Sequence, residues 1–531
     1  MLSITTEMSI EIRQLTGHNT FHTGHTEFDV MPESTSSISD ELNDFDLTIR
    51  NGRISNADGT FFADIGVRNG VIAAIEPNLP PGREDVDADG LWVLPGGIDS
   101  HTHIEQLSGM GVMCADDFYS GTVSAAFGGT TSILSFAAQH RNDRITDVLA
   151  DYAERAREKA VIDYGFHLIL TNPDEQTLTQ DLPSVIESGI TSLKVYMTYD
   201  ALKLDDYQLL DVLATAGEHG ALVMLHAENH DMIRWVARRL LERGHYAPKY
   251  HAVAHDVLAE SEATHRAITL SRLVDVPVLI VHVAGSETVD IIRHARNLGA
   301  AVHAESCPQY LFLEAKDSDR EAMEGAKFCC SPPPGDVRSQ ESVWQGFKDG
   351  TLTVYSSDHA PYRFDASGKL PKGDKTKFKE MANGVPGIEL RLPLLFSEGV
   401  ITGRITIEEF VALTATNHAH MYGMASQKGS IQKGLDADLA LWDPASRRTI
   451  TADQLHDNVG YTPYEGRVVT GWPVQVFSRG RCIVKEGSLQ AERGSGKFIA
   501  RERPSPVVQR TGTTPGRNLF RQQIGLGVFR K

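Results

Sequence analysis

Side chains able to bind metal stand at the ends of separate strand-like runs, and this ordered set limits the possible fold more than any other feature. In chain order the set is His101, His103, Lys194, His226, His282 and Asp358. Each follows β-branched or apolar residues that are typical of a buried strand. In a parallel barrel, the carboxyl ends of all strands meet at one face. The set therefore predicts a metal centre at the mouth of a barrel.

Strand-like runs alternate with helical stretches between about residues 96 and 430. Eight such runs lie near 97–103, 130–136, 164–170, 192–197, 222–227, 278–284, 300–305 and 352–357. The stretch 143–160 between two of them has apolar residues at helical spacing, with charged residues on its other face. This alternation predicts an α/β fold, a (β/α)8 TIM barrel, over residues 96–430.

Short strands with turn residues flank the predicted barrel. In 46–95, the pairs Asn51-Gly52 and Asn69-Gly70 are typical of two-residue hairpin turns between antiparallel strands. The same alternation of turns and strands returns in 431–500. We expect the two flanks to pair in one small β-sandwich domain.

The two ends of the chain lack such patterns. Residues 1–45 are polar and include Pro-Glu-Ser-Thr-Ser-Ser, so we expect a flexible N-terminal extension. Residues 501–531 hold Pro, Arg, Gly and Thr without periodicity, so we expect a C-terminal tail.

The composition argues against several classes of function. Acidic residues outnumber basic ones, 70 against 51, and the net charge of -19 disfavours binding to nucleic acid or to an anionic membrane. The five cysteines form no C-x-x-C pair, so we expect neither a disulfide framework nor a thiolate zinc site, and we expect a cytoplasmic protein. The sequence contains no run of 18 apolar residues, so it predicts no membrane span.

The histidines are suited to divalent metal ions. His101 and His103 project to one side of a strand, because side chains alternate with period two. A lone H-x-H triplet is weak evidence among 21 histidines, but this one follows a Pro-Gly-Gly turn into the first barrel strand. His226 or His282 alone would more readily be a buried core histidine. Together, the four imidazoles could hold two metal ions.

Lys194 could supply the anionic bridge that two metal ions need. An ammonium group has no lone pair for a metal, but a lysine buried beside cations is driven towards its neutral amine. A neutral amine can add carbon dioxide to form a carbamate, whose two oxygens can bridge two metals. The ordinary alternative is an ion-paired lysine in the barrel.

Asp358 is the candidate general base and acid. At the end of the eighth strand it could bind one metal, take a proton from the attacking water and return it to a leaving nitrogen. Two metal ions would lower the pKa of that water and polarise the carbonyl. The ordinary alternative is an aspartate that caps a helix.

These residues resemble the metal-site pattern of the amidohydrolase superfamily. Nearer still, the chain resembles the dihydropyrimidinase/hydantoinase family of cyclic amidases. The resemblance runs from about residue 46 to 500. Beyond the metal-site residues, it rests on the segments 115–131, 193–199, 305–311 and 464–474, the last being Tyr-Glu-Gly-Arg-Val-Val-Thr-Gly-Trp-Pro-Val.

The resemblance implies two divalent metal ions, zinc or another such as manganese, bridged by carboxylated Lys194. One ion would be held by His101, His103 and Asp358, and the other by His226 and His282. It also implies that the Tyr199 hydroxyl stabilises the developing oxyanion, and that backbone groups of Ser331 and Asn383 bind the ring amide. Without the resemblance, these three would be a core tyrosine and two loop residues. A homotetramer is expected from the family.

The implied reaction opens a cyclic amide or imide, a hydantoin or dihydropyrimidine, to an N-carbamoyl amino acid. An allantoinase-like or other cyclic amidase is the alternative. Dihydroorotases carry an arginine two residues after the H-x-H pair, but this chain has Glu105 there. A non-catalytic scaffold is disfavoured, because every ligand position is intact. The leucine, valine and methionines of the loop 104–113 predict an apolar, adaptable wall for the ring substituent.

Overall fold

A nearly closed parallel barrel forms the centre of the described structure. The computed structural model describes residues 45–508 and 522–525. All but the last residue of the predicted extension 1–45 lies outside this range. The barrel strands are β6 (Gly97–Thr102), β7 (Thr130–Ala138), β8 (Asp163–Ile169), β9 (Ser192–Tyr196), β10 (Leu222–His226), β11 (Val278–Ile280), β12 (Val302–Ser306) and β13 (Val354–Tyr355). Each pairs with the next in chain order, which confirms the predicted (β/α)8 fold.

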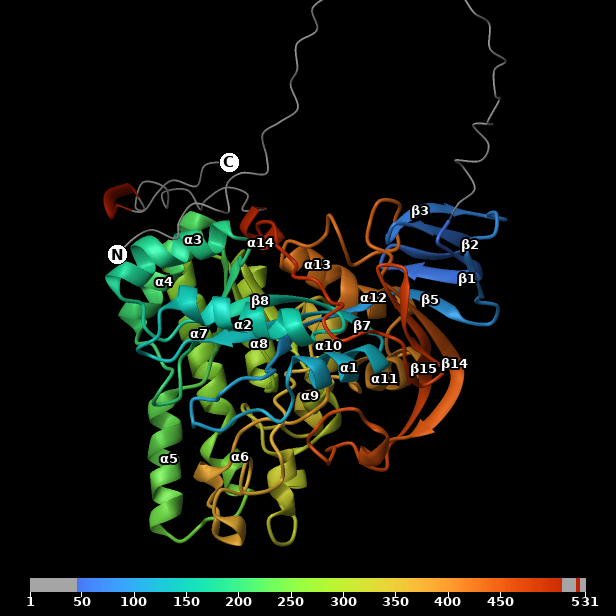
Figure 1. Cartoon of the computed structure of the whole chain (residues 1–531). Helices are drawn as coiled ribbons and strands as arrows, with labels where there is room; N and C mark the ends of the chain where they lie inside the picture. The colour runs from blue at the N-terminus through green and yellow to red at the C-terminus, as the bar shows by residue number, and fades with distance from the viewer. Residues whose placement is uncertain (1–44, 509–521, 526–531) are drawn as a thin grey trace, which may run out of the picture. The chain divides into compact units, whose positions relative to one another are not determined.

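The first and last barrel strands come together through side chains and a short bridge. Thr102 pairs with His359 in parallel, and the hydroxyls of Ser100 and Ser356 lie 3.2 Å apart. The strands are buried on both faces, as expected when helices cover a parallel sheet. Figure 1 shows the helices around the barrel.

The helices between the strands differ greatly in length. They are α1 (Phe118–Phe127), α2 (Ile145–Lys159), α3 (Leu182–Glu187), α4 (Asp206–His219), α5 (His230–Glu242), α6 (Tyr250–Ala254), α7 (Val257–Val274), α8 (Ser286–Asn297), α9 (Gln309–Phe312) and α10 (Val337–Lys348). After β13 follow α11 (Arg391–Leu395), α12 (Ile407–Val411), α13 (Asn417–Met421) and α14 (Ser505–Val508). The predicted helical stretch 143–160 is α2.

Both flanks of the barrel contribute to a second, nine-stranded sheet. Its strands are β1 (Leu47–Asn56), β2 (Gly59–Arg68), β3 (Val71–Glu76), β4 (Glu84–Asp87), β5 (Trp92–Pro95), β14 (Leu439–Thr449), β15 (Val468–Ser478), β16 (Arg481–Lys485) and β17 (Ser488–Leu489). β5 and β14 join the flanks as antiparallel neighbours, which confirms the predicted pairing, and the two flanks lie side by side in Figure 1. β1 also runs parallel to β4 and β5, so the sheet is mixed rather than antiparallel throughout.

One of the two predicted hairpin turns is wrong. Asn51 and Gly52 lie inside β1, where Asn51 has a φ of 56° and the register shifts between Ile49 and Gly52. This is a β-bulge, in which an extra residue takes the left-handed conformation that a type I′ turn also requires. The backbone N–H of Asn51 donates to Asp64 Oδ1 at 2.9 Å. The turn at Asn69-Gly70, between β2 and β3, is confirmed.

The chain after β17 returns to the barrel. Ile499 N donates to Tyr164 O at 2.7 Å. Arg501 is buried, and its guanidinium donates to Ser192 Oγ at 2.7 Å and to the Phe166 carbonyl. Arg501 begins the predicted tail, so the start of that segment packs against the barrel strands. Residues 509–521 and 526–531 lie outside the described residues.

Candidate active site

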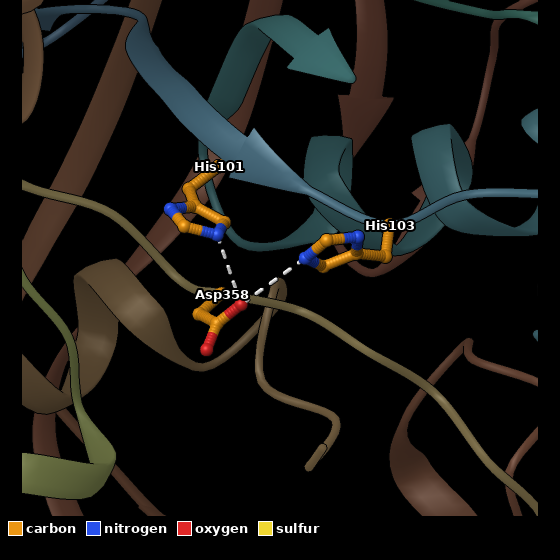
Figure 2. Close-up of side chains that lie close together, drawn as sticks. All are labelled: His101, His103 and Asp358. Atoms are coloured by element: carbon orange, nitrogen blue, oxygen red, sulfur yellow. Dashed lines mark ion pairs between the residues drawn. The ribbon is translucent and has the colours of Figure 1, made fainter. Parts of the chain in front are cut away.

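The metal-site residues predicted from the sequence meet at the carboxyl ends of the barrel strands. His101 lies near the end of β6 and His103 directly follows that strand, as Figure 2 shows. Lys194 lies in β9 and His226 ends β10. His282 and Asp358 follow β11 and β13. In a TIM barrel this face carries the active site.

His101, His103 and Asp358 point towards one another in Figure 2. Asp358 Oδ1 lies 3.1 Å from His101 Nε2 and 3.4 Å from His103 Nε2. One ligand atom from each residue falls within 4.8 Å of the other two. Two imidazole nitrogens and a carboxylate oxygen at this spacing form a donor set that suits a divalent metal.

His226 and His282 form the other half of the site. Their ring centroids lie 4.5 Å apart, and the His282 ring lies 5.5 Å from that of His101. His282 Nδ1 is buried without a hydrogen-bond partner among the described residues. A buried nitrogen without a partner is costly, so these rings fit a site that binds a further group.

Lys194 lies between the two halves. Its side chain is buried, and Nζ lies 3.5 Å from His101 Nε2 and 5.0 Å from the centroid of the Phe136 ring. No carboxylate of the described residues forms an ion pair with it, so the ordinary reading as an ion-paired lysine does not fit. Burial lowers the pKa of the Lys194 amine to about 8, which favours the neutral form that a carbamate requires.

The surrounding charges keep Asp358 ionised. Burial alone would raise its pKa, but the charge of His101 and hydrogen bonds from His101 and His103 hold the pKa of Asp358 well below its ordinary value. Asp358 and His282 also have left-handed backbones, with φ of 48° and 42°. Non-glycine residues adopt this conformation uncommonly, and it clusters at functional sites.

Three polar residues that the sequence analysis did not single out orient the histidines. His101 Nδ1 donates to Glu305 at 2.6 Å, and His103 Nδ1 donates to Gln106 at 2.8 Å. His226 Nε2 donates to Glu228 at 2.6 Å. Such partners fix the ring orientation and, when a metal binds, favour the tautomer whose other ring nitrogen offers its lone pair. Two of these partners could have been found in the sequence: Glu305 lies near the end of strand β12, and Glu228 lies two residues after His226.

A second group of carboxylates has the spacing of a metal site but is already neutralised. Asp163, Asp436 and Asp438 surround the Nζ of Lys428 at 2.7, 2.9 and 2.6 Å. Asp163 begins β8, so this cluster lies at the amino-terminal end of that strand, away from the candidate site. It is a buried salt-bridge cluster.

A cavity of about 340 Å³ opens over the metal-site residues. Its lining includes every site residue predicted from the sequence: His101, His103, Lys194, Tyr199, His226, His282, Ser331, Asp358 and Asn383. Burial raises the pKa of the Tyr199 phenol, so its hydroxyl stays protonated and can donate a hydrogen bond. The Oδ1 of Asn383 is buried without a hydrogen-bond partner among the described residues.

The loop after His103 contributes Gln106, Ser108, Gly109 and Met110 to the cavity lining, so its share of the wall is less apolar than predicted. Of its leucine, valine and methionines, Met110 lines the cavity, whereas Leu107, Val112 and Met113 are not among the lining residues. The other apolar lining residues include Leu202, Ile233 and Phe378.

Glu105 points away from the cavity. Its carboxylate accepts a hydrogen bond from Lys159 at 2.6 Å. This position, which is an arginine in dihydroorotases, is therefore an ion-paired glutamate here and offers no cation to a substrate.

The geometry is that of a metal-dependent hydrolase built on a TIM barrel, and the comparisons agree. Residues 92–483 match the model of the Amidohydrolase family. A D-hydantoinase of Geobacillus stearothermophilus is 42% identical over 456 residues, 85% of this chain and 96% of that protein. The crystal structure of a dihydropyrimidinase from Brevibacillus agri NCHU1002 superposes with a TM-score of 0.84 at 41% identity, covering 86% of this chain and 99% of that one.

The chain therefore belongs to the dihydropyrimidinase/hydantoinase family of the amidohydrolase superfamily. It is a hydrolase that acts on C–N bonds of cyclic amides. The family and the arrangement of the histidines and Asp358 support a binuclear metal site. No helix among the described residues is long and apolar enough to cross a membrane.

Proposed function

We propose that the protein opens the ring of a hydantoin or dihydropyrimidine by hydrolysis of its amide, and releases an N-carbamoyl amino acid. The observation that carries this proposal is the single cavity lined by the metal-site residues together with Tyr199, Ser331 and Asn383. Similar proteins named D-hydantoinase, D-phenylhydantoinase and dihydropyrimidinase support this substrate class.

The proposed metal ligands are His101, His103 and Asp358 for one ion and His226 and His282 for the other, with carboxylated Lys194 between them. Imidazole and carboxylate donors accept zinc and manganese alike, and zinc is our proposal. When bound, the ions would polarise the scissile carbonyl and lower the pKa of the attacking water.

The protein's own groups would then manage protons and developing charge. Asp358 would take a proton from the attacking water and return it to the ring nitrogen as the C–N bond breaks. The Tyr199 hydroxyl would donate a hydrogen bond to the carbonyl oxygen as it gains charge. Its raised pKa keeps that proton in place at neutral pH.

The ring amide would bind to backbone groups of Ser331 and Asn383. Neither residue forms a backbone–backbone hydrogen bond in the part of the chain that the structure describes. Because buried peptide groups are nearly always paired, unpaired ones beside a cavity are suited to a ligand that has both a donor and an acceptor. A cyclic imide has both.

We further propose that the protein is a cytoplasmic homotetramer, and that its domain limits lie at 46–95, 96–430 and 431–500.

A substrate panel tests the proposal. Metal-loaded protein would be assayed with dihydrouracil, hydantoin, both enantiomers of an aromatic hydantoin, allantoin and dihydroorotate. Turnover of dihydrouracil or of the hydantoins, with appearance of the N-carbamoyl product, is the expected result. Turnover of allantoin alone would favour the allantoinase-like alternative. Inactivity on the whole panel, from protein shown to hold two metals per chain, would overturn the proposal.

A further inference from the structure

A lysine outside the metal site is fully buried without a carboxylate partner. Lys369 is 0% exposed, and its Nζ donates to the carbonyls of Cys329 and Ala382, both at 2.9 Å. No ion pair of Lys369 with a carboxylate is found among the described residues. Burying a charged amine is costly, so the burial of Lys369 beside two carbonyls, with no carboxylate as partner, needs an explanation.

The two carbonyls belong to the two segments that carry the proposed substrate-binding groups. Cys329 lies two residues before Ser331, and Ala382 directly precedes Asn383. The segments are 40 and 13 residues away from Lys369 in sequence, so the amine joins parts of the chain that no regular element connects.

Other hydrogen bonds complete the same framework. Gly384 N donates to Cys329 O at 3.0 Å, which links the two segments directly. His251 Nε2 donates to Cys330 O at 2.8 Å. Thus the carbonyls of Cys329 and Cys330, the two residues before Ser331, are both held by hydrogen bonds. Ala382 O has no backbone donor in the described part of the chain, so its position depends on Lys369.

We propose that Lys369 is a positioning residue, which holds the backbone of Ser331 and Asn383 at the spacing that one ring amide requires. This proposal rests on the proposed function for its substrate. Lys369 does not line the cavity, so it acts through the two segments and not by contact with the ring. Burial lowers its pKa to about 8, and a neutral amine still has two N–H donors for two carbonyls.

Three variants separate positioning from general stability. Lys369→Met keeps the shape but removes the donors, and Lys369→Arg keeps donors and charge. Lys372→Met is the matched control, because Lys372 lies in the same segment but is exposed and pairs with Glu380 at the surface. Each would be measured for metal content, kcat and KM on the substrate that the wild type turns over best. Hydrogen exchange would be followed in peptides that cover 326–333 and 381–386.

For Lys369→Met we expect KM to rise about tenfold with a smaller change in kcat, because the ring is bound in both the ground and transition states. Metal content should stay at the wild-type level, and exchange at the Gly384 amide should accelerate. Lys369→Arg should recover part of the KM, and Lys372→Met should match the wild type. If Lys369→Met lowers only the melting temperature, with KM and exchange in both peptides unchanged, the positioning role is wrong.

The exchange measurement is independent of turnover. If the wild type is inactive on every substrate, the proposed function fails, yet faster exchange in both peptides of Lys369→Met would still support the framework. Unchanged exchange would overturn it in either case.

Discussion

Glu305 Oε1 accepts a hydrogen bond from His101 Nδ1 at 2.6 Å, and both side chains are fully buried. Glu305 also accepts from the Ser356 hydroxyl at 2.8 Å. This contact leaves His101 Nε2 facing Asp358, which it approaches to 3.1 Å. A carboxylate behind a metal-binding histidine fixes the ring and raises the basicity of its free nitrogen.

Glu305→Gln should weaken metal binding by about 10- to 100-fold, because an amide is a poorer acceptor than a carboxylate. Equilibrium dialysis against zinc, with metal measured by mass spectrometry, would show the loss. Glu341→Gln is a control at the surface, where the Glu341 side chain is 58% exposed and pairs with Arg404. Wild-type affinity in Glu305→Gln would show that the His101 ring is held by its other contacts.

Asp358→Asn should still bind metal, more weakly because a neutral amide replaces a carboxylate ligand, and at full metal occupancy it should lower kcat by about 10² to 10⁴, because an amide cannot accept the proton of the attacking water. The pKa of Asp358 lies well below its ordinary value, so the carboxylate is ionised throughout the neutral range. The wild type should therefore show no loss of activity from Asp358 protonation near neutral pH. Equal kcat in Asp358→Asn and wild type at full metal occupancy would remove Asp358 as the base.

Tyr199→Phe should lower kcat by about 10² to 10³ with little change in stability, because one donor to the developing oxyanion is lost. Tyr207→Phe is the matched control, since Tyr207 is 76% exposed and does not line the cavity. Steady-state kinetics and thermal unfolding would be compared for both. A change in KM alone for Tyr199→Phe would indicate that the hydroxyl binds the substrate without assisting the chemical step.

The sequence was sufficient for the barrel and for the residues at its mouth because both depend on local patterns. A buried parallel strand such as β9 has a short apolar run, and Lys194 interrupts it with a side chain that is costly to bury. Alone, such a residue indicates no more than an ion-paired lysine, and the histidines at the ends of the other runs are what point to a metal site. The same reasoning located His226 and His282 at the ends of their runs.

Contacts between distant residues could not be predicted in this way. His101 and Glu305 are 204 residues apart, and Lys369 reaches Cys329 across an irregular loop. The bulge at Asn51 was mistaken for a turn, because a bulge and a type I′ turn both need a residue with positive φ. Only the register in which β1 pairs with β2 distinguishes a bulge from a turn at this position.

Lys194 gives the sharpest pH test. Its pKa is lowered to about 8, so in the metal-free protein the amine becomes mostly neutral above that pH, whereas an ordinary lysine stays charged until about pH 10.4. Only the neutral amine adds carbon dioxide. At a constant concentration of dissolved carbon dioxide, the rate of carbamate formation should rise about tenfold per pH unit below pH 8 and level off above it.

Metal-free protein treated with ¹³C-labelled carbon dioxide would report the carbamate by NMR, and Lys194→Ala would identify the signal by its absence. Lys194→Ala should also lose metal and activity, and short carboxylic acids should restore part of both, because a carboxylate offers the same two oxygens as the carbamate. A rate that keeps rising to pH 10 would mean that burial does not lower the pKa of Lys194. Full activity in Lys194→Ala would mean that no carbamate at this position bridges the metals.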